Sequence, residues 1–160
     1  MTSTIKDLSC KIYLEAGLAQ PGLADLLSVG ASTEVSPGPS SLLIRNEIGE
    51  LEVRRNDDRD RESAREFPDG FLHFRSVIEF YPRTTASRDD EVNYIAQLLD
   101  RLWSSRVPAV ASCDYEGELP HHGGYRDPSL PWPSAPQNGL NDDSRPVEFG
   151  VRDRPSVSSS

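Results

Sequence analysis

The residues best suited to do chemistry gather in the segment 113–125, where small apolar residues give way to acids and histidines. Two of the three histidines of the chain lie here side by side, close to three acidic residues. The side chains concerned are Cys113, Asp114, Tyr115, Glu116, Glu118, His121, His122 and Tyr125. Their types suit three kinds of chemistry: metal binding, catalysis, and recognition of a basic protein surface.

Metal binding would use the two histidines with the carboxylates and Cys113, all of which are ligand types found in metal sites. Adjacent histidines point apart on a regular element, however, and no Cys-x-x-Cys or His-x-x-x-His pair accompanies them. Residues 56–60 offer oxygen ligands for calcium but lack the glycine and the closing glutamate of a calcium loop. The sequence therefore predicts neither a metal nor another cofactor.

Catalysis would use Cys113 as a thiolate with a neighbouring histidine as its base. The nearby acids would raise the pKa of that thiol and oppose the role. Asp114 and Glu116 form an alternative acid/base pair, with His121 and His73 as further members. No nucleophile elbow, Walker loop or dinucleotide fingerprint occurs in the sequence. A small enzyme with a site around Asp114, Glu116 and His121 is therefore kept as the alternative function.

The third interpretation is an acidic binding edge. Asp114, Glu116 and Glu118 would project from the end of the last strand, beside Tyr115 and Tyr125. Clustered carboxylates with aromatic anchors suit a protein surface rich in Arg or Lys. The simplest competing interpretation is a solvated turn, which the two glycines before Tyr125 allow to reverse direction.

The net charge of -9 at pH 7 restricts the classes of partner. Nucleic acids and anionic membranes attract Lys and Arg, so we expect neither as a partner, whereas a basic protein is favoured. The sequence has no apolar stretch of 18 residues and no signal-peptide core at its start. We therefore expect a cytoplasmic protein whose two cysteines, Cys10 and Cys113, are reduced.

Apolar periodicity predicts an α+β domain over residues 5–120. The expected elements are a strand over 8–14, a helix over 17–28, two hairpin strands over 42–45 and 50–55, a strand over 71–81, a helix over 89–105 and a strand over 107–115. The segments 33–41 and 56–66 are predicted to be loops, the second solvated by its mixed charges. The strand over 71–81 is expected to face the helices with Leu72, Phe74, Ile78 and Phe80.

This order of elements resembles the ferredoxin-like plait. The resemblance implies an antiparallel sheet with both helices on one face and with its first and last strands adjacent, possibly with an extra hairpin strand. Cys10 and Cys113 would then lie on adjoining strands, as small apolar residues or as a redox pair. A Pro-rich strap over residues 121–149, anchored by Trp132, and a disordered tail over 150–160 are expected to follow.

Size, acidity and general layout together resemble small acidic immunity proteins that neutralise bacterial toxins. The resemblance implies a bacterial, non-enzymatic protein-binding module, since an acidic surface can occupy the basic cleft of a nucleic-acid-cleaving toxin. The residues expected to face the partner are Asp114, Tyr115, Glu116, Glu118 and Tyr125.

Overall fold

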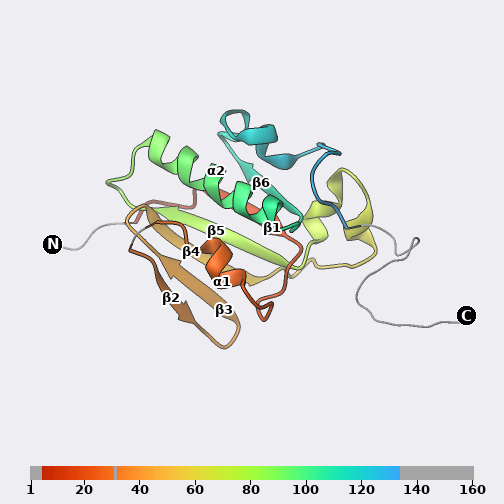
Figure 1. The fold of residues 1–160 in the computed structure, drawn as a ribbon, viewed down its shortest axis with the longest axis horizontal. Coiled ribbons are helices and arrows are strands. Elements are labelled where there is room, and N and C mark those ends of the chain that lie inside the picture. Colours follow the sequence, from red (N-terminus) through yellow and green to blue (C-terminus); the bar gives the residue numbers. More distant parts are fainter. Residues whose placement is uncertain (1–4, 31, 134–160) are drawn as a thin grey trace, which may run out of the picture.

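The computed structural model describes residues 5–30 and 32–133, which form a mixed α+β fold (Figure 1). The strands are β1 Cys10–Leu14, β2 Glu34–Pro37, β3 Ser41–Arg45, β4 Gly49–Arg55, β5 Ser76–Pro82 and β6 Ala109–Cys113. They form one antiparallel sheet in the order β2-β3-β4-β5-β1-β6. The helices are α1 Leu23–Leu27, α2 Arg88–Ser104 and four 3-10 helices, η1 Ser63–Arg65, η2 Asp69–His73, η3 Glu116–Glu118 and η4 Pro120–Gly124.

The hairpin predicted over 42–45 and 50–55 is confirmed as β3 and β4, which pair in register from Ser41 to Arg45. The prediction of a loop over 33–41 is wrong in part, because β2 lies there and pairs with β3 at the edge of the sheet. Pro37 is compatible with this edge strand, since no further strand requires the N–H group that proline lacks.

The expected adjacency of the first and last strands is confirmed, because Cys10 of β1 lies directly opposite Cys113 of β6. The ferredoxin-like order itself is not confirmed. The sheet has six strands rather than four, with β2 and β3 lying beyond β4. The first helix, α1, is also only five residues long, much shorter than the predicted helix over 17–28.

The strand predicted over 71–81 is wrong in its first half, because residues 69–73 form the 3-10 helix η2 and β5 begins only at Ser76. Leu72 is 44% exposed, so its predicted place in the core is wrong. Phe74 is buried, but it packs in a cluster with Phe71 and Val110 rather than under the helices. The turn of η2 interrupts the two-residue alternation on which the prediction relied.

The helix α2 begins with the predicted cap. The Ser87 hydroxyl accepts a hydrogen bond from the Asp90 backbone N–H (3.0 Å), and the Asp90 carboxylate accepts one from the Ser87 N–H (2.9 Å). Both helices lie over the same face of the sheet (Figure 1). The fully buried side chains between the two layers include Ile12, Leu14, Leu23, Leu27, Ile44, Leu51, Ile78, Phe80, Ile95, Leu98 and Leu99.

A second, smaller cluster covers part of the opposite face. It contains Ala64, Phe71, Phe74 and Val110, with Tyr13 and Trp132 packed against it. The prediction that segment 56–66 is a wholly solvated loop is therefore wrong at Ala64, which is 1% exposed, and at Asn56, which is 6% exposed. The buried amide of Asn56 is satisfied by two backbone carbonyls, those of residues 72 and 74, at 2.9 Å each.

The start of the predicted strap is ordered against this second cluster. The Trp132 ring lies 5.2 Å from that of Phe74 and 5.1 Å from that of Phe67, and its Nε1–H donates to the Arg65 carbonyl at 2.9 Å. Trp132 therefore contacts both the 3-10 segments and the sheet side, whereas residues 120–124, at the start of the predicted strap, form the 3-10 helix η4. The rest of the strap and the tail, residues 134–160, lie outside the described residues. In the part described, α2 is the longest helix, and none has the length and apolarity to cross a bilayer.

Candidate functional site

The turn after β6 keeps its acids largely occupied within the chain. Asp114 is exposed, but Glu116 accepts a hydrogen bond from the backbone N–H of Cys113 at 3.0 Å and so closes the turn. Glu118 forms an exposed ion pair with Arg88 (3.4 Å). The same Arg88 guanidinium lies 4.9 Å from the centre of the Tyr115 ring. An arginine of this chain therefore already occupies the position that a basic partner would take.

The two tyrosines predicted to face a partner differ in exposure and in position. Tyr115 is only 4% exposed, so its assignment as a partner-facing residue is corrected: its ring belongs to the main core. Tyr125 is 36% exposed, but its side chain lies against η2 rather than beside the acids of the turn. Its hydroxyl donates to Asp69 at 2.6 Å, and its ring lies 5.7 Å from that of Phe71. The predicted combination of acids and aromatic anchors is thus divided between two places.

The histidines do not join the acids of the turn. Both adopt left-handed backbone conformations, with φ of 55° at His121 and 52° at His122. Residues other than glycine rarely adopt this conformation. His121 Nδ1 lies 2.6 Å from an Asp127 oxygen. Hydrogen bonds from Ser129 and from His121 hold the pKa of Asp127 below its usual range. Across residues 5–30 and 32–133, no three His, Cys, Asp or Glu side chains come together as a metal site would require.

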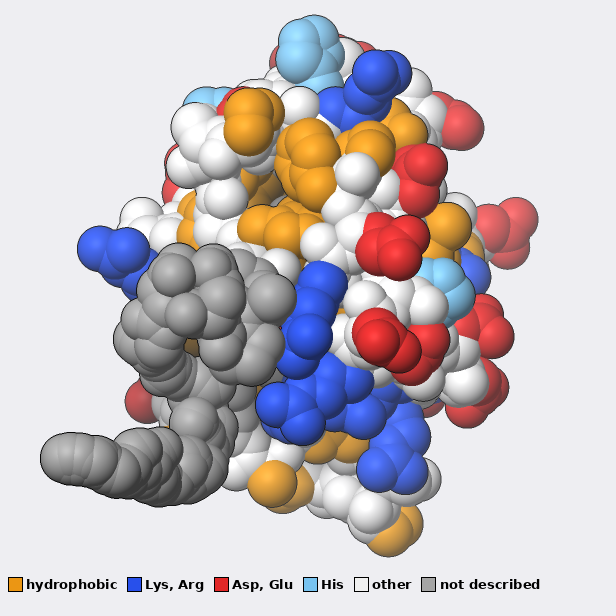
Figure 2. Space-filling view, turned by 90° about the vertical axis from the view of Figure 1, so that its right-hand side faces the viewer, with side chains coloured by type: hydrophobic (Ala, Val, Ile, Leu, Met, Phe, Trp, Pro, Cys, Tyr) orange, Lys and Arg blue, Asp and Glu red, His pale blue; other side chains and the backbone are white. Residues whose placement is uncertain are grey.

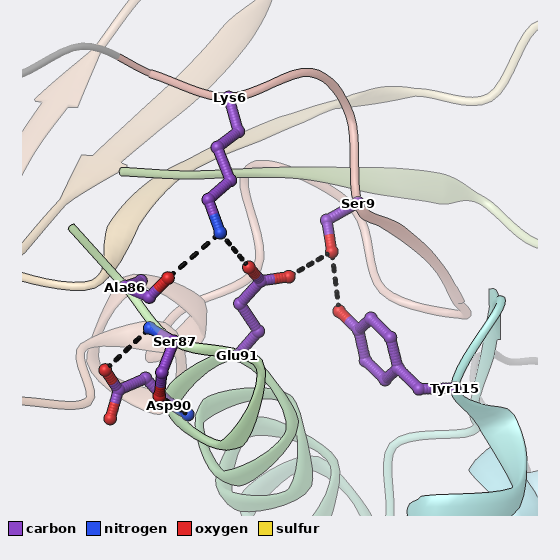
Figure 3. A network of polar contacts seen from close by, with 7 residues as sticks. All are labelled: Lys6, Ser9, Ala86, Ser87, Asp90, Glu91 and Tyr115. Carbon is purple, nitrogen blue, oxygen red and sulfur yellow. Dashed lines mark hydrogen bonds and ion pairs between the residues drawn. The ribbon is translucent and has the colours of Figure 1, made fainter. Parts of the chain in front are cut away.

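Beneath the start of α2 lies a buried polar network that sequence reasoning missed (Figure 3). The Glu91 carboxylate, 7% exposed, accepts from Lys6 Nζ at 2.7 Å and from the Ser9 hydroxyl at 2.8 Å. Ser9 also shares a hydrogen bond with the Tyr115 hydroxyl (2.9 Å), and burial raises the pKa of that phenol. The sequence feature that could have indicated this network is Glu91, which lies one helical turn before Ile95 on the apolar face of α2. The network joins three distant segments and serves the fold.

The two cysteines lie opposite each other on the neighbouring strands β1 and β6. The Cys10 thiol donates to the Lys11 carbonyl at 3.6 Å, and its interaction with the neighbouring Cys113 thiol raises the pKa of Cys10 and lowers that of Cys113. Cys10 is 1% exposed, whereas Cys113 is partly exposed. Both thiols are free.

We expect iodoacetamide to alkylate Cys113 in the folded protein and to leave Cys10 unmodified until the protein unfolds. Cys113 is the more exposed thiol and has the lowered pKa. Peptide mass spectrometry after timed alkylation at several pH values measures both rates. In a Cys10→Ala variant, the pH midpoint for Cys113 should move upward, because the neighbouring thiol that lowers its pKa is lost. Equal rates at the two cysteines, or an unmoved midpoint, would contradict this coupling.

A group of aromatic side chains lies beside η2. We call it the aromatic patch; it consists of Phe67, Phe71, Tyr125 and Trp132, whose rings contact each other in pairs. Phe67 is 45% exposed and Tyr125 36%. Figure 2 shows apolar side chains on the upper part of the face that it draws, with acidic ones beside them. Phe71 is buried and Trp132 half-buried, so Phe67 and Tyr125 form the exposed part of the patch. Exposed aromatic side chains with charged neighbours are typical of binding surfaces.

A hollow of about 210 Å³ opens beside the aromatic patch. Its lining includes Glu66, Phe67, Asp69 and His73, and we call it the acidic hollow. Tight packing of backbone on backbone shapes its floor, because a Cβ on Gly70 would lie 2.5 Å from the Ser63 carbonyl oxygen. Two carboxylates and an aromatic ring thus surround a space of side-chain size.

Sequence reasoning missed the acidic hollow because Glu66 ended the mixed-charge segment 56–66 and Asp69 lay between that segment and the strand predicted over 71–81. Their relation to Tyr125, 56 positions further along the chain from Asp69, depends on the tertiary fold. No family model, curated protein or solved structure matches this chain. The arrangement of its own side chains therefore carries the functional argument.

Proposed function

We propose that this chain is a non-enzymatic protein-binding module that binds a basic protein through the acidic hollow and the aromatic patch. The observation that carries the proposal is the hollow of about 210 Å³, in which Glu66 and Asp69 stand beside the Phe67 ring. Such a space fits one arginine or lysine side chain. The carboxylates would pair with its charge, and the ring would contact the cation or its aliphatic stem.

The aromatic patch would supply the apolar part of the interface. Aromatic anchors next to charged groups dominate binding energy at many protein interfaces, and their rigid rings lose little conformational entropy on binding. Tyr125 already donates to Asp69 at 2.6 Å, so this carboxylate is held in place before a partner arrives. The net charge of -9 would speed the encounter with a basic partner.

The biological form that we propose is an immunity protein of a bacterial cytoplasm that neutralises a toxin with a basic cleft. The acidity of the chain and the pairing of carboxylates with aromatic rings support this form. At the level of the fold, the order β4-β5-β1-β6 supports a ferredoxin-like plait extended at one edge by β2 and β3.

The test begins with capture of a partner from the source organism, identification by mass spectrometry and purification of that partner. The double variant Glu66→Gln/Asp69→Asn and the single variant Phe67→Ser are each expected to weaken its binding by about tenfold or more. Val35→Ser is the matched control, because Val35 is 41% exposed and lies on the edge strand β2. The control should bind within about twofold of the parent chain.

Calorimetry of the purified partner with each variant gives the decisive comparison. Binding should also weaken as salt rises, because the contacts involve exposed charges. An acidic partner, or unchanged binding by both test variants, would refute the proposal. If Asp114→Asn and Glu118→Gln weakened binding while the test variants did not, the turn after β6 would be the binding site instead.

A further inference from the structure

A second pocket, of about 580 Å³, lies where the end of β4 meets the start of β5. Three arginines line it, Arg55, Arg59 and Arg75, together with the backbone around Gly17. We call it the basic pocket. Figure 2 shows Lys and Arg side chains gathered on the lower part of the face, below the acidic ones. The chain has a net charge of -9, so three arginines around one pocket form a positive site on a negatively charged protein.

The backbone holds these arginines in place. Arg55 ends β4 directly opposite Ser76, the first residue of β5. The next residue, Asn56, donates its backbone N–H to the Arg75 carbonyl at 2.9 Å and accepts the N–H of Arg59 at 3.1 Å. Because Asn56 is 6% exposed and its side chain is fully hydrogen-bonded, it fixes the relative positions of the three arginines. The backbone at the basic pocket is therefore held in place, while the three arginine side chains are exposed.

Carboxylates balance only part of this positive charge. Glu15 lies 3.7 Å from Arg75 Nε and also accepts the Arg75 backbone N–H at 2.9 Å. Within the described ranges, Arg55 and Arg59 have no ion pair. Three guanidinium groups beside one carboxylate leave two positive charges. A Cβ on Gly17 would lie 3.4 Å from Arg75 Nη1, so the Arg75 guanidinium lies close over this glycine.

The acids of the neighbouring loop do not line the basic pocket, although three of them stand between Arg55 and Arg61 in the sequence. Asp60 instead accepts a hydrogen bond from the Ser63 hydroxyl, which lowers the pKa of Asp60. The other two acids, Asp57 and Asp58, are exposed.

We infer that the basic pocket binds a small molecule through a phosphomonoester group. A phosphomonoester carries close to two negative charges at neutral pH, which matches the two unbalanced positive charges. Guanidinium groups donate paired hydrogen bonds in a geometry that fits phosphate oxygens. A volume of about 580 Å³ lies within the range of small-molecule sites. This inference does not depend on the proposed binding of a basic protein, which uses a different set of residues.

The test uses the full chain at low ionic strength and three probes: inorganic phosphate, ribose 5-phosphate and succinate. Titrations followed by backbone amide NMR should show saturable shifts at residues 55–59 and 75 with the two phosphates. Ribose 5-phosphate should bind more tightly than inorganic phosphate, because the pocket has room for the sugar. Arg59→Gln and Arg55→Gln should each weaken binding by about tenfold or more, whereas Arg88→Gln, on α2, should leave it unchanged.

Several results would overturn the inference. One is the absence of saturable binding of either phosphate at tens of millimolar. Equal losses in Arg59→Gln and Arg88→Gln would show non-specific attraction to the protein surface. Succinate binding as tightly as ribose 5-phosphate would show a carboxylate site instead.

Thermal unfolding of the Arg59→Gln and Arg55→Gln variants is the control for folding. Unfolding temperatures equal to that of the parent chain would establish that a loss of binding reflects the pocket rather than the fold.

Discussion

Phe80→Ala is expected to lower the free energy of unfolding by about 3 to 5 kcal/mol. Phe80 lies in the middle of β5 and is fully buried under α2, with its ring 5.2 Å from that of Tyr94. Its neighbours across the sheet are Cys10 and Leu51, both buried. Removal of the ring leaves a cavity that these strands cannot close without moving. Urea denaturation followed by circular dichroism measures the change.

Leu72→Ala is the matched control for this experiment. The two-residue alternation of the sequence places Leu72 on the same face as Phe80, but the structure places it on η2, 44% exposed. We therefore expect a loss of less than about 1 kcal/mol. A loss as large as that of Phe80→Ala would show that the strand continues through residue 72 and that η2 is misplaced.

Lys6→Met is expected to destabilise the protein by about 2 to 3 kcal/mol, because it leaves the buried Glu91 carboxylate without its cation. Glu91 has a side chain only 9% exposed, whereas Lys6 is 35% exposed, so the loss falls below that of a fully buried pair. Ser9 remains as a donor to Glu91 at 2.8 Å but cannot offset the charge. Thermal and urea unfolding at neutral pH measure the effect.

A double variant separates the charge from the packing. Lys6→Met combined with Glu91→Met should be more stable than Lys6→Met alone, because the unpaired buried charge has been removed. Arg88→Ala is the control, since the Arg88–Glu118 pair is more than half exposed on both sides and should contribute at most about 1 kcal/mol. If Arg88→Ala cost as much as Lys6→Met, the network would have no special role in stability.

The acidic hollow and the basic pocket have opposite charge. Opposite charges select different occupants, so the two proposals can fail separately. The Glu66→Gln/Asp69→Asn variant should keep its affinity for ribose 5-phosphate, and Arg59→Gln should keep its affinity for a basic protein. The segment between Arg55 and Arg75 contributes to both sites.

Several features could be predicted from the sequence because neighbouring residues determine them. The start of α2 follows from Ser87 and Asp90, which satisfy each other's backbone groups within one turn. The hairpin of β3 and β4 follows from two apolar runs around a short turn. The adjacency of the strands that carry Cys10 and Cys113 was correctly expected because the order of elements limits how the strands can be arranged.

The sites themselves depended on contacts between distant residues. Periodicity indicates which side chains share a face of one element, but it does not show which elements meet. The sequence alone left Tyr115 able to face a partner, but in the structure its hydroxyl is hydrogen-bonded to Ser9 and its ring lies under the Arg88 guanidinium. The acidic hollow exists because residues 69–73 form η2 instead of continuing the predicted strand, and the basic pocket exists because the ends of β4 and β5 meet the backbone around Gly17. The sequence alone determined the α+β class and the main elements, and the tertiary structure alone decided which charges converge.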